Sequence, residues 1–332
     1  MAGIPSLEHP VRLHEAPEDT YLELIQAAAN HIGIPAVHVE KDYWVTRVLK
    51  RLHESDHRET VVFKGGTSLS KAHHLIERFS EDVDLALKRD ESLSDSARGR
   101  LIKPIEATIT RDLEYRPDHP GESKHGRFRK TAHAFPMRTD AAGLGQVSDT
   151  LLVEINSFAD PEPSSEMSIA TLIHDFLVTT GRLELVPLHE LDPFSIHVLS
   201  VERTLCEKIM GLVRAGHEAN PVQEFRRRIR HFYDLVMIMR VDRYRQFVAT
   251  DAFVDLMTEV RESDRESMPD SRVWLSPSLS EAMIVADAKS LWSQVRSEFH
   301  GSFRDMVYGD SIPDDAEVLE CLASIGASLT RV

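Results

Sequence analysis

The chain has 332 residues and is acidic, with 39 Lys and Arg residues against 54 Asp and Glu residues and a formal net charge of −15. This charge argues against a protein that coats nucleic acid non-specifically, because such binding depends on many contacts between basic side chains and phosphates. With 42% hydrophobic and 28% charged residues, the composition is typical of a globular protein of about two domains.

The sequence lacks the features of a membrane or secreted protein. Its apolar runs are too short to span a bilayer, and its first residues carry no basic region followed by an apolar one. The two cysteines, Cys206 and Cys321, form neither a metal-ligand spacing nor a disulfide framework. We therefore expect a cytoplasmic protein with no membrane partner.

Two amphipathic helices are expected before residue 55. The first begins after Pro17, where Glu18 and Asp19 suit the positive end of a helix, and it ends before Gly33. The second covers residues 36–54, over which apolar residues recur at helical spacing.

The stretch Val61–Leu87, VVFKGGTSLSKAHHLIERFSEDVDLAL, carries the clearest pattern. Its β-branched and aromatic start predicts a short strand that ends at a Gly65-Gly66 turn. Thr67 or Ser68 can cap the helix that follows, whose first N–H groups would then bind an anion such as a phosphate. A Gly-Gly turn taken alone is more often only a turn.

Asp82 and Asp84 lie in the second predicted strand of this stretch. Side chains at i and i+2 share a face of a strand, so both carboxylates project to one side while Val83 and Leu85 point into a core. Two adjacent carboxylates repel each other unless a cation lies between them. The pattern predicts Mg²⁺ held beside a nucleoside triphosphate, although an Asp-x-Asp pair on an edge strand is more often simply solvated.

The order strand, Gly-Gly, helix, Asp-x-Asp strand resembles the signature of the DNA polymerase β-like nucleotidyltransferase superfamily. GGTSLSK followed by RFSEDVDL resembles the first motif of the AbiEii/AbiGii family of nucleotidyltransferase-like toxins. The resemblance implies an α+β fold, in which a polymerase β-like core, a small mixed sheet with helices, precedes a C-terminal helical domain. It also implies the toxin of a bacterial toxin–antitoxin or phage-defence pair, with an NTP substrate, Mg²⁺ and a cognate antitoxin. Some members of the family modify the 3′ end of tRNA.

Glu154 is the candidate for a third carboxylate. It lies in LLVEINSF, residues 151–158, which predict a strand with Leu151 and Val153 on one face and Glu154 on the other. Polymerase β-like sites place a carboxylate on a strand beside the Asp-x-Asp strand, where it shares the metal ion or accepts a proton from the attacking hydroxyl. A strand Glu that faces solvent is an equal alternative.

The remaining predicted elements are a helix over residues 101–113 and strands over residues 128–138, 176–178 and 183–185. From Asp192 onward the pattern is helical, with helices predicted over residues 247–260, 279–299 and 315–329. We expect a nucleotidyltransferase-like domain over residues 1–185 and a helical domain over residues 186–332.

Lys208 and Asp234 are candidate site residues in the helical half. In the AbiEii family a Lys on a helix, followed by an Asp in an R-x-x-D-L-like stretch, belongs to the active site, and Lys208 and the Asp of RHFYDLVMI match these positions. The resemblance implies that Lys208 neutralises charge on the triphosphate and that Ser80 adds a hydroxyl near the phosphates. The alternatives are an ordinary Lys packed along an apolar stripe and an ion pair of Asp234 with Arg230.

Two basic stretches are candidates for contact with an RNA acceptor. Residues 111–138 hold seven Lys and Arg against four Asp and Glu, and residues 222–245 hold seven against three. A solvated basic face explains both equally well.

Taken together, the motifs and the resemblance predict transfer of a nucleotide from an NTP to an acceptor, for which the resemblance favours the 3′ end of tRNA. Nucleotidylation of a protein or small molecule, and nucleotide binding without catalysis, are the alternatives.

Overall fold

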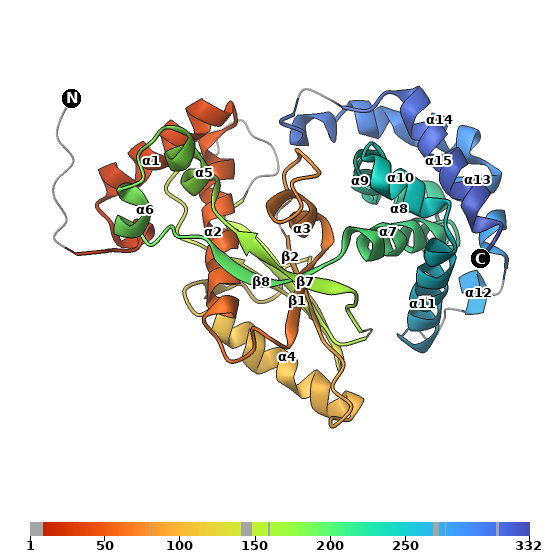
Figure 1. Cartoon of the computed structure of the whole chain (residues 1–332), viewed down its shortest axis with the longest axis horizontal. Helices are drawn as coiled ribbons and strands as arrows, with labels where there is room; N and C mark the ends of the chain where they lie inside the picture. Colours follow the sequence, from red (N-terminus) through yellow and green to blue (C-terminus); the bar gives the residue numbers. More distant parts are fainter. Residues whose placement is uncertain are drawn as a thin grey trace. The chain divides into compact units, whose positions relative to one another are not determined.

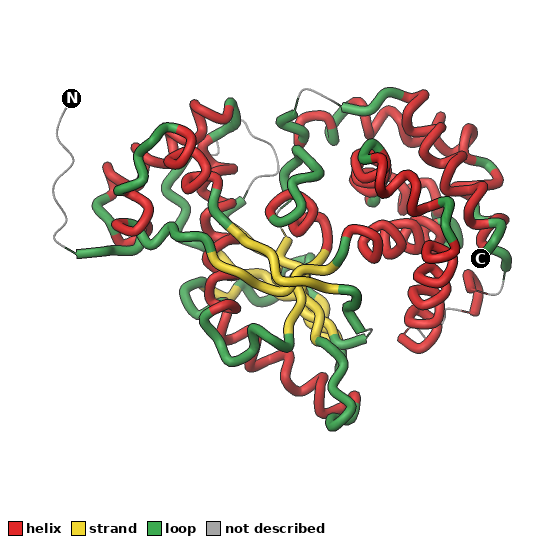
Figure 2. Tube along the Cα trace, in the orientation of Figure 1, coloured by secondary structure: helices red, strands yellow, loops and turns green. Residues whose placement is uncertain are grey.

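The computed structural model describes most of the chain, namely residues 9–80, 82–140, 148–158, 160–267, 272–275, 277–309 and 312–332. Within these ranges the chain forms two compact units that alternate along the sequence. Unit 1 comprises residues 1–67, 80–157 and 165–198, and unit 2 comprises residues 68–79, 158–164 and 199–332. Figure 1 labels the elements, and Figure 2 shows that strands are concentrated in unit 1 and helices dominate unit 2.

Unit 1 is built around a mixed sheet with the strand order β3-β5-β6-β2-β1-β8-β7, and β4 pairs with β5. The strands are β1 (Val61–Lys64), β2 (Asp82–Leu87), β3 (Glu114–Tyr115), β4 (Ser123–His125), β5 (Phe128–Ala134), β6 (Thr150–Asn156), β7 (Ser164–Ile169) and β8 (Phe194–Leu199). β2 pairs antiparallel with β1 and parallel with β6, whereas β5 is antiparallel to β6 and β8 is parallel to β1. The Asp-x-Asp strand β2 therefore lies inside the sheet and is not an edge strand.

Unit 1 also contains the helices α1 (Glu18–Ile32), α2 (Ala36–His53), α4 (Asp95–Ile109), α5 (Leu172–Thr179) and α6 (Leu185–Leu188). Of these, α2 and α4 contact strands of the sheet. α1 packs against α2 and α5, α2 contacts β2, and α4 contacts β5 and β6. Val83, Leu85 and Val153 are fully buried on the strands, and burial of each such side chain stabilises the fold by about 1.5–3 kcal/mol. The other face of β2 and β6 carries Asp82, Asp84, Glu154 and Asn156, together with Ala86 and Leu152.

Unit 2 is a helical bundle. Its helices are α7 (Val201–Ala215), α8 (Pro221–Arg227), α9 (Ile229–Met239), α10 (Asp242–Val248), α11 (Asp251–Ser267), α12 (Arg272–Leu275), α13 (Met283–Ala286), α14 (Ala288–His300) and α15 (Asp315–Leu329). α7 packs against α9 and α11, and α15 packs against α9 and α14. Aromatic residues fill the core, where Trp292 lies edge-on to Phe299 with 5.1 Å between ring centroids.

Most of the predicted elements are confirmed. β1, β2, β5, β6, α1, α2 and α15 lie where the sequence indicates. α4 begins earlier than expected because the Ser94 hydroxyl caps it by accepting a hydrogen bond from the Ala97 N–H. α3 (Gly65–Lys71) starts directly at Gly65, so no separate turn follows β1.

Three predictions for residues 176–199 are wrong. Residues 176–178 lie in α5, because Thr171 caps this helix and Ile173 and Phe176 bury one of its faces at helical spacing. Residues 183–185 precede and begin α6 and form no strand. Phe194–Leu199 forms β8 where a helical pattern is expected. Apolar runs this short do not separate a strand from a buried helix by periodicity alone.

The two compact units divide the chain at other positions than the predicted boundary after residue 185. Unit 1 continues to Val198, and unit 2 takes in residues 68–79. The assignment of residues 1–185 and 186–332 to separate domains stays a prediction, because compactness alone does not test independent folding. In the part of the chain that the structure describes, no helix has the length and apolar character needed to cross a bilayer.

Candidate functional site

Asp82, Asp84 and Glu154 lie on one face of two neighbouring strands. β2 and β6 run parallel, and their register places Asp84 beside Glu154, with Asp82 two residues earlier on β2. Directly paired side chains in a sheet have Cβ atoms about 5 Å apart. The structure thus brings together the three predicted carboxylates, while their roles as metal ligands or base stay predictions.

Two lysines flank these carboxylates across the sheet. Lys64 on β1 is paired with Asp84, and Lys130 on β5 is paired with Glu154. The Lys130 Nζ lies 3.7 Å from Glu154 Oε2 and 3.8 Å from Asp82 Oδ2. We call Lys64, Asp82, Asp84, Lys130 and Glu154 the charged face.

The electrostatics of the charged face favour a further cation. Burial of its carboxylate and repulsion from Glu154 and Asp82 raise the pKa of Asp84 to about 7, although both lysines act in the opposite direction. Carboxylate oxygens are the ligands that Mg²⁺ prefers. Within the described ranges, however, no three Asp, Glu, His or Cys side chains are arranged to hold a metal ion in their present positions. The donor chemistry of the three carboxylates nevertheless fits a divalent ion.

Gly65 packs against the Asp84 carboxylate. Its φ angle is +79°, in the left-handed region, and a Cβ atom at this position would overlap the Asp84 side chain. A larger residue would therefore suffer both backbone strain and a steric clash. Gly66 follows within α3. Binding of nucleotide phosphates by these two glycines stays a prediction.

Thr67 and Ser68 do not cap α3, because both lie inside a helix that begins at Gly65. The Thr67 hydroxyl lies 2.8 Å from Ser80 Oγ and 2.5 Å from the carbonyl oxygen of Asp82. Since a hydroxyl has one proton, Thr67 can donate to the carbonyl while it accepts from Ser80. Thr67 thus ties α3 to the start of β2. Ser68 is fully buried, and the phosphate contacts expected of Thr67, Ser68 and Ser80 stay predictions.

Lys208 and Asp234 meet in the interior of unit 2. Lys208 Nζ on α7 donates to Asp234 Oδ2 on α9 at 2.6 Å, and Arg78 donates to both oxygens of the same carboxylate at 2.7 Å. Burial alone would raise the pKa of Asp234, but the Arg78 and Lys208 charges outweigh it and hold this pKa well below its usual range. The carboxylate is fully buried and matched by two cations.

This cluster corrects two alternatives left open by the sequence. Asp234 pairs with Arg78 and Lys208, and not with Arg230, the partner that helical spacing suggests. Lys208 is only 6% exposed and directs its ammonium to a buried carboxylate, so it is not an ordinary surface lysine. It belongs to unit 2, whereas the charged face belongs to unit 1. Contact between Lys208 and a triphosphate therefore stays a prediction.

Several side chains of the two basic stretches form ion pairs within the protein. In the first stretch Arg129 pairs with Glu106, and in the second Arg228 pairs with Glu224. Such pairs reduce the positive charge that a stretch offers to phosphates. Neither stretch by itself marks an RNA-binding surface.

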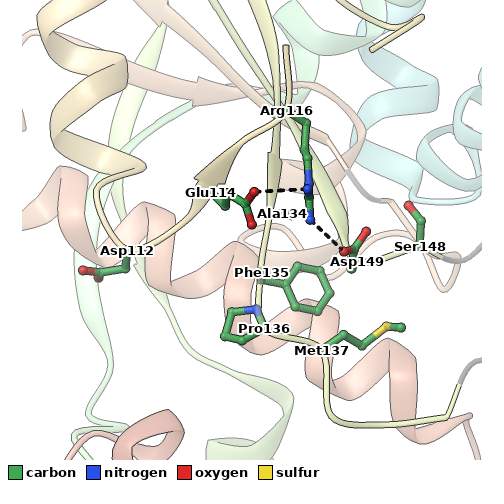
Figure 3. Close-up of a pocket in the computed structure, with 9 residues that line it drawn as sticks. All are labelled: Asp112, Glu114, Arg116, Ala134, Phe135, Pro136, Met137, Ser148 and Asp149. Carbon is green, nitrogen blue, oxygen red and sulfur yellow. Dashed lines mark hydrogen bonds and ion pairs between the residues drawn. The ribbon is translucent and has the colours of Figure 1, made fainter. Parts of the chain in front are cut away.

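A pocket of about 660 Å³ lies in unit 1 at the end of β5, as Figure 3 shows. Phe135 and Met137 give it an apolar side, and Arg116 at its rim pairs with Glu114 and Asp149. The residues that line it include none of the predicted site residues. The pocket and the charged face therefore have no residue in common.

Sequence reasoning missed Lys64, Lys130 and Arg78. The two lysines join the carboxylates through strand register, and Lys130 stands in the sequence only as part of a basic stretch. Arg78 is the first residue of the motif RFSEDVDL, and this position was the only signal for it in the motif. Its partner Asp234 lies 156 residues further on, so the ion pair is not visible from the motif.

Comparisons with known proteins agree with these motifs. The model of the family described as "Nucleotidyl transferase AbiEii toxin, Type IV TA system" matches residues 47–321. Among solved structures, the chain is similar to MenT4, a nucleotidyltransferase toxin from Mycobacterium tuberculosis H37Rv, with 18% identity and a TM-score of 0.44 over 91% of this chain and 98% of that one. No curated protein matches the sequence. Because the family match covers most of the chain, the protein belongs to the AbiEii family of nucleotidyltransferase toxins of type IV toxin–antitoxin systems.

Proposed function

We propose that this toxin transfers a nucleotide from an NTP to an RNA acceptor, with the 3′ end of tRNA as the expected point of attachment. The observation that carries the proposal is the charged face, where Asp82, Asp84 and Glu154 share one side of two paired strands next to Gly65. Family membership supplies the reaction class and implies an NTP substrate and an antitoxin partner. The choice of tRNA rests on the resemblance of GGTSLSK and RFSEDVDL to the first motif of the family, some members of which modify the 3′ end of tRNA.

Asp82, Asp84 and Glu154 would hold Mg²⁺ in this reaction. Their oxygen chemistry suits the ion, and the raised pKa of Asp84 marks negative charge that the two lysines do not fully balance. When bound, the ion would neutralise charge on the triphosphate and on the pyrophosphate that leaves.

The chain's own groups would bind and orient the triphosphate and accept a proton from the acceptor. Gly65 and Gly66 would leave room for the phosphates, with Thr67, Ser68 and Ser80 beside them, and Lys208, held by Asp234, would offset triphosphate charge. Glu154 would accept the proton of the acceptor hydroxyl. The hydroxyl oxygen then bonds to the α-phosphorus, and the bond from phosphorus to the bridging oxygen breaks as pyrophosphate leaves.

Incorporation of label from each of the four NTPs tests this proposal. The purified toxin is incubated with an α-labelled NTP and either total RNA or total protein, alongside Asp82→Ala, Asp84→Ala and a control, Asp255→Ala, on the exposed side of α11. We expect label in RNA of tRNA size, loss of label and of toxicity in both carboxylate variants, and no change in the control. Full activity of either carboxylate variant would contradict the proposed site.

A protein acceptor is the second candidate. It is favoured by the ion pairs in the basic stretches, which lower the charge available to RNA. Label that enters the protein fraction and spares the RNA fraction would identify it. Nucleotide binding without catalysis would give no label in either fraction.

A further inference from the structure

Lys130 lies between two of the proposed metal ligands. Its Nζ is almost equidistant from Asp82 Oδ2 at 3.8 Å and Glu154 Oε2 at 3.7 Å. The three side chains are 21–25% exposed, so the interaction is partly shielded from water and less weakened than one on an open surface.

Strand pairing fixes this position of Lys130. β5 pairs with β6 along its whole length, and the register sets Lys130 opposite Glu154, with Thr131 and Arg129 opposite the apolar Val153 and Ile155. A slip of one residue would turn the Lys130 side chain to the other side of the sheet. The strand register therefore fixes the Lys130 ammonium on the charged face.

A divalent cation and the Lys130 ammonium compete for the same oxygens. Mg²⁺ binds carboxylate oxygens at about 2.0–2.1 Å, so an ion on Asp82 and Glu154 would lie within roughly 6 Å of the ammonium in its present position. Positive charges at such a separation repel each other in a partly shielded site. Lys130 must therefore be displaced, or be repelled, when a cation binds.

We propose that Lys130 is the internal counterion of the charged face, which takes the place of the divalent cation between Asp82 and Glu154 and thereby sets the affinity of the site for that cation. The inference rests on the proposed metal-binding role of these carboxylates. It agrees with the finding that, among the described residues, no group of three or more such side chains is arranged to hold a metal ion. Lys130 is a positioning residue in this account, because it acts through the carboxylates.

Mn²⁺ binding by the full chain without nucleotide, followed by electron paramagnetic resonance, tests the inference. The variants are Lys130→Gln, Lys130→Arg and a control, Lys124→Gln, whose ammonium pairs with Glu122 at 3.0 Å. We expect Lys130→Gln to bind Mn²⁺ about 5- to 20-fold more tightly than the wild type, because a competing charge is removed. Lys130→Arg keeps the charge and should bind no more tightly than the wild type, and Lys124→Gln should be unchanged.

Thermal unfolding gives a second readout. In EDTA, Lys130→Gln should unfold at a lower temperature than the wild type, since the carboxylates then repel without a counterion, and Mn²⁺ should raise its unfolding temperature by more than it raises that of the wild type. This larger gain distinguishes a counterion from a residue that only packs.

Four outcomes would overturn the inference. Equal or weaker Mn²⁺ binding by folded Lys130→Gln contradicts it, as does tighter binding by Lys130→Arg, which remains informative if the Gln variant does not fold. If wild-type binding is abolished by Asp82→Asn but unchanged in Lys130→Gln, the metal role survives and the counterion role alone fails. If neither the wild type nor Lys130→Gln binds Mn²⁺, the counterion role fails, and the label-incorporation assay alone decides the proposed function.

Discussion

Asp84 is partly buried and Asp234 fully buried, and their surroundings shift their pKa values in opposite directions. The two other carboxylates of the charged face help to raise the pKa of Asp84 to about 7, whereas Arg78 and Lys208 hold the pKa of Asp234 below its usual range. A raised carboxyl pKa beside like charges is typical of functional sites, because it marks charge that a ligand can balance. The Asp234 carboxylate is instead fully buried, and two cations of the protein already balance its charge.

Substitution of Asp84 should stabilise the protein at high pH. Its carboxyl pKa of about 7 lies above the ordinary 3.8, so the native state holds more protons between these values and loses stability as the pH rises through 7. Asp84→Asn imitates the protonated group and should raise the free energy of unfolding by about 1–3 kcal/mol at pH 8 in EDTA, with little effect at pH 4. Urea unfolding at both pH values checks this, and an equal effect at both would contradict it.

Substitution of Asp234 should have the opposite effect. Asp234→Asn leaves Arg78 and Lys208 buried without a counterion and should lower the free energy of unfolding at pH 7 by about 3–5 kcal/mol. Because the native pKa is lowered, this contribution is present above the ordinary carboxyl pKa of 3.8 and is lost as the pH falls below it. Urea unfolding from pH 7 to pH 3 should show the gap between wild type and variant closing. The exposed-site control Asp255→Asn should differ from the wild type by less than about 0.5 kcal/mol.

The residues of the site differ in how far their positions could be predicted from the sequence. Asp82 and Asp84 share a face by strand geometry alone, so their juxtaposition needs no tertiary information. The position of Glu154 depends on which strand pairs with β2, and that of Lys130 depends on the register of the next pair. Sequence patterns do not encode register between strands that lie 24 to 70 residues apart when several registers bury the same apolar face.

At the scale of elements, the site depends on three consecutive elements, β1, α3 and β2. α3 begins at Gly65 without an intervening turn, and its first residue touches the carboxylate of the antiparallel neighbour strand. The backbone thus needs a residue that tolerates positive φ and has no Cβ. This requirement explains the first glycine of GGTSLSK in structural terms, beside any contact with phosphate.

Gly65→Ala should be more damaging than a substitution that adds backbone strain alone. Gly33 ends α1 with a similar φ of +82° but has nothing within 4 Å of a Cβ atom, so Gly33→Ala should cost about 1–2 kcal/mol from strain. Gly65→Ala adds the clash with Asp84 and should cost at least about 1 kcal/mol more. Thermal or urea unfolding of the two variants measures the difference, and equal losses would show that Asp84 moves aside without cost.

The predicted elements failed where local signals conflict with tertiary pairing. FLV at residues 176–178 is a strong strand former, but the Thr171 cap and burial against α1 and α2 make it helical. Phe194–Leu199 forms a strand because β1 offers it a parallel partner, which is not visible from its own residues. The sequence predicts the longer periodic segments α1, α2 and α15 well, whereas the helix expected over residues 279–299 is divided into a 3-10 helix, α13 and α14.

At the scale of the whole molecule, the chain combines a mixed-sheet unit that carries the charged face with a helical unit that carries the Arg78–Lys208–Asp234 cluster. The family match runs across both, from residue 47 to residue 321. Because the protein has a net charge of −15 and several basic side chains are ion-paired, the proposed RNA acceptor would have to be recognised through a local surface.

Whether the carboxylates of the charged face serve nucleotide transfer is decided by the fate of the two ends of the triphosphate. The toxin is incubated with total RNA and with NTP labelled at either the α- or the γ-phosphate, in the wild type and in Asp82→Asn. We expect α-label to join RNA, γ-label to leave as pyrophosphate, and the rate to fall at least about 100-fold in the variant. Transfer of γ-label to the RNA, or equal rates for wild type and variant, would contradict the account.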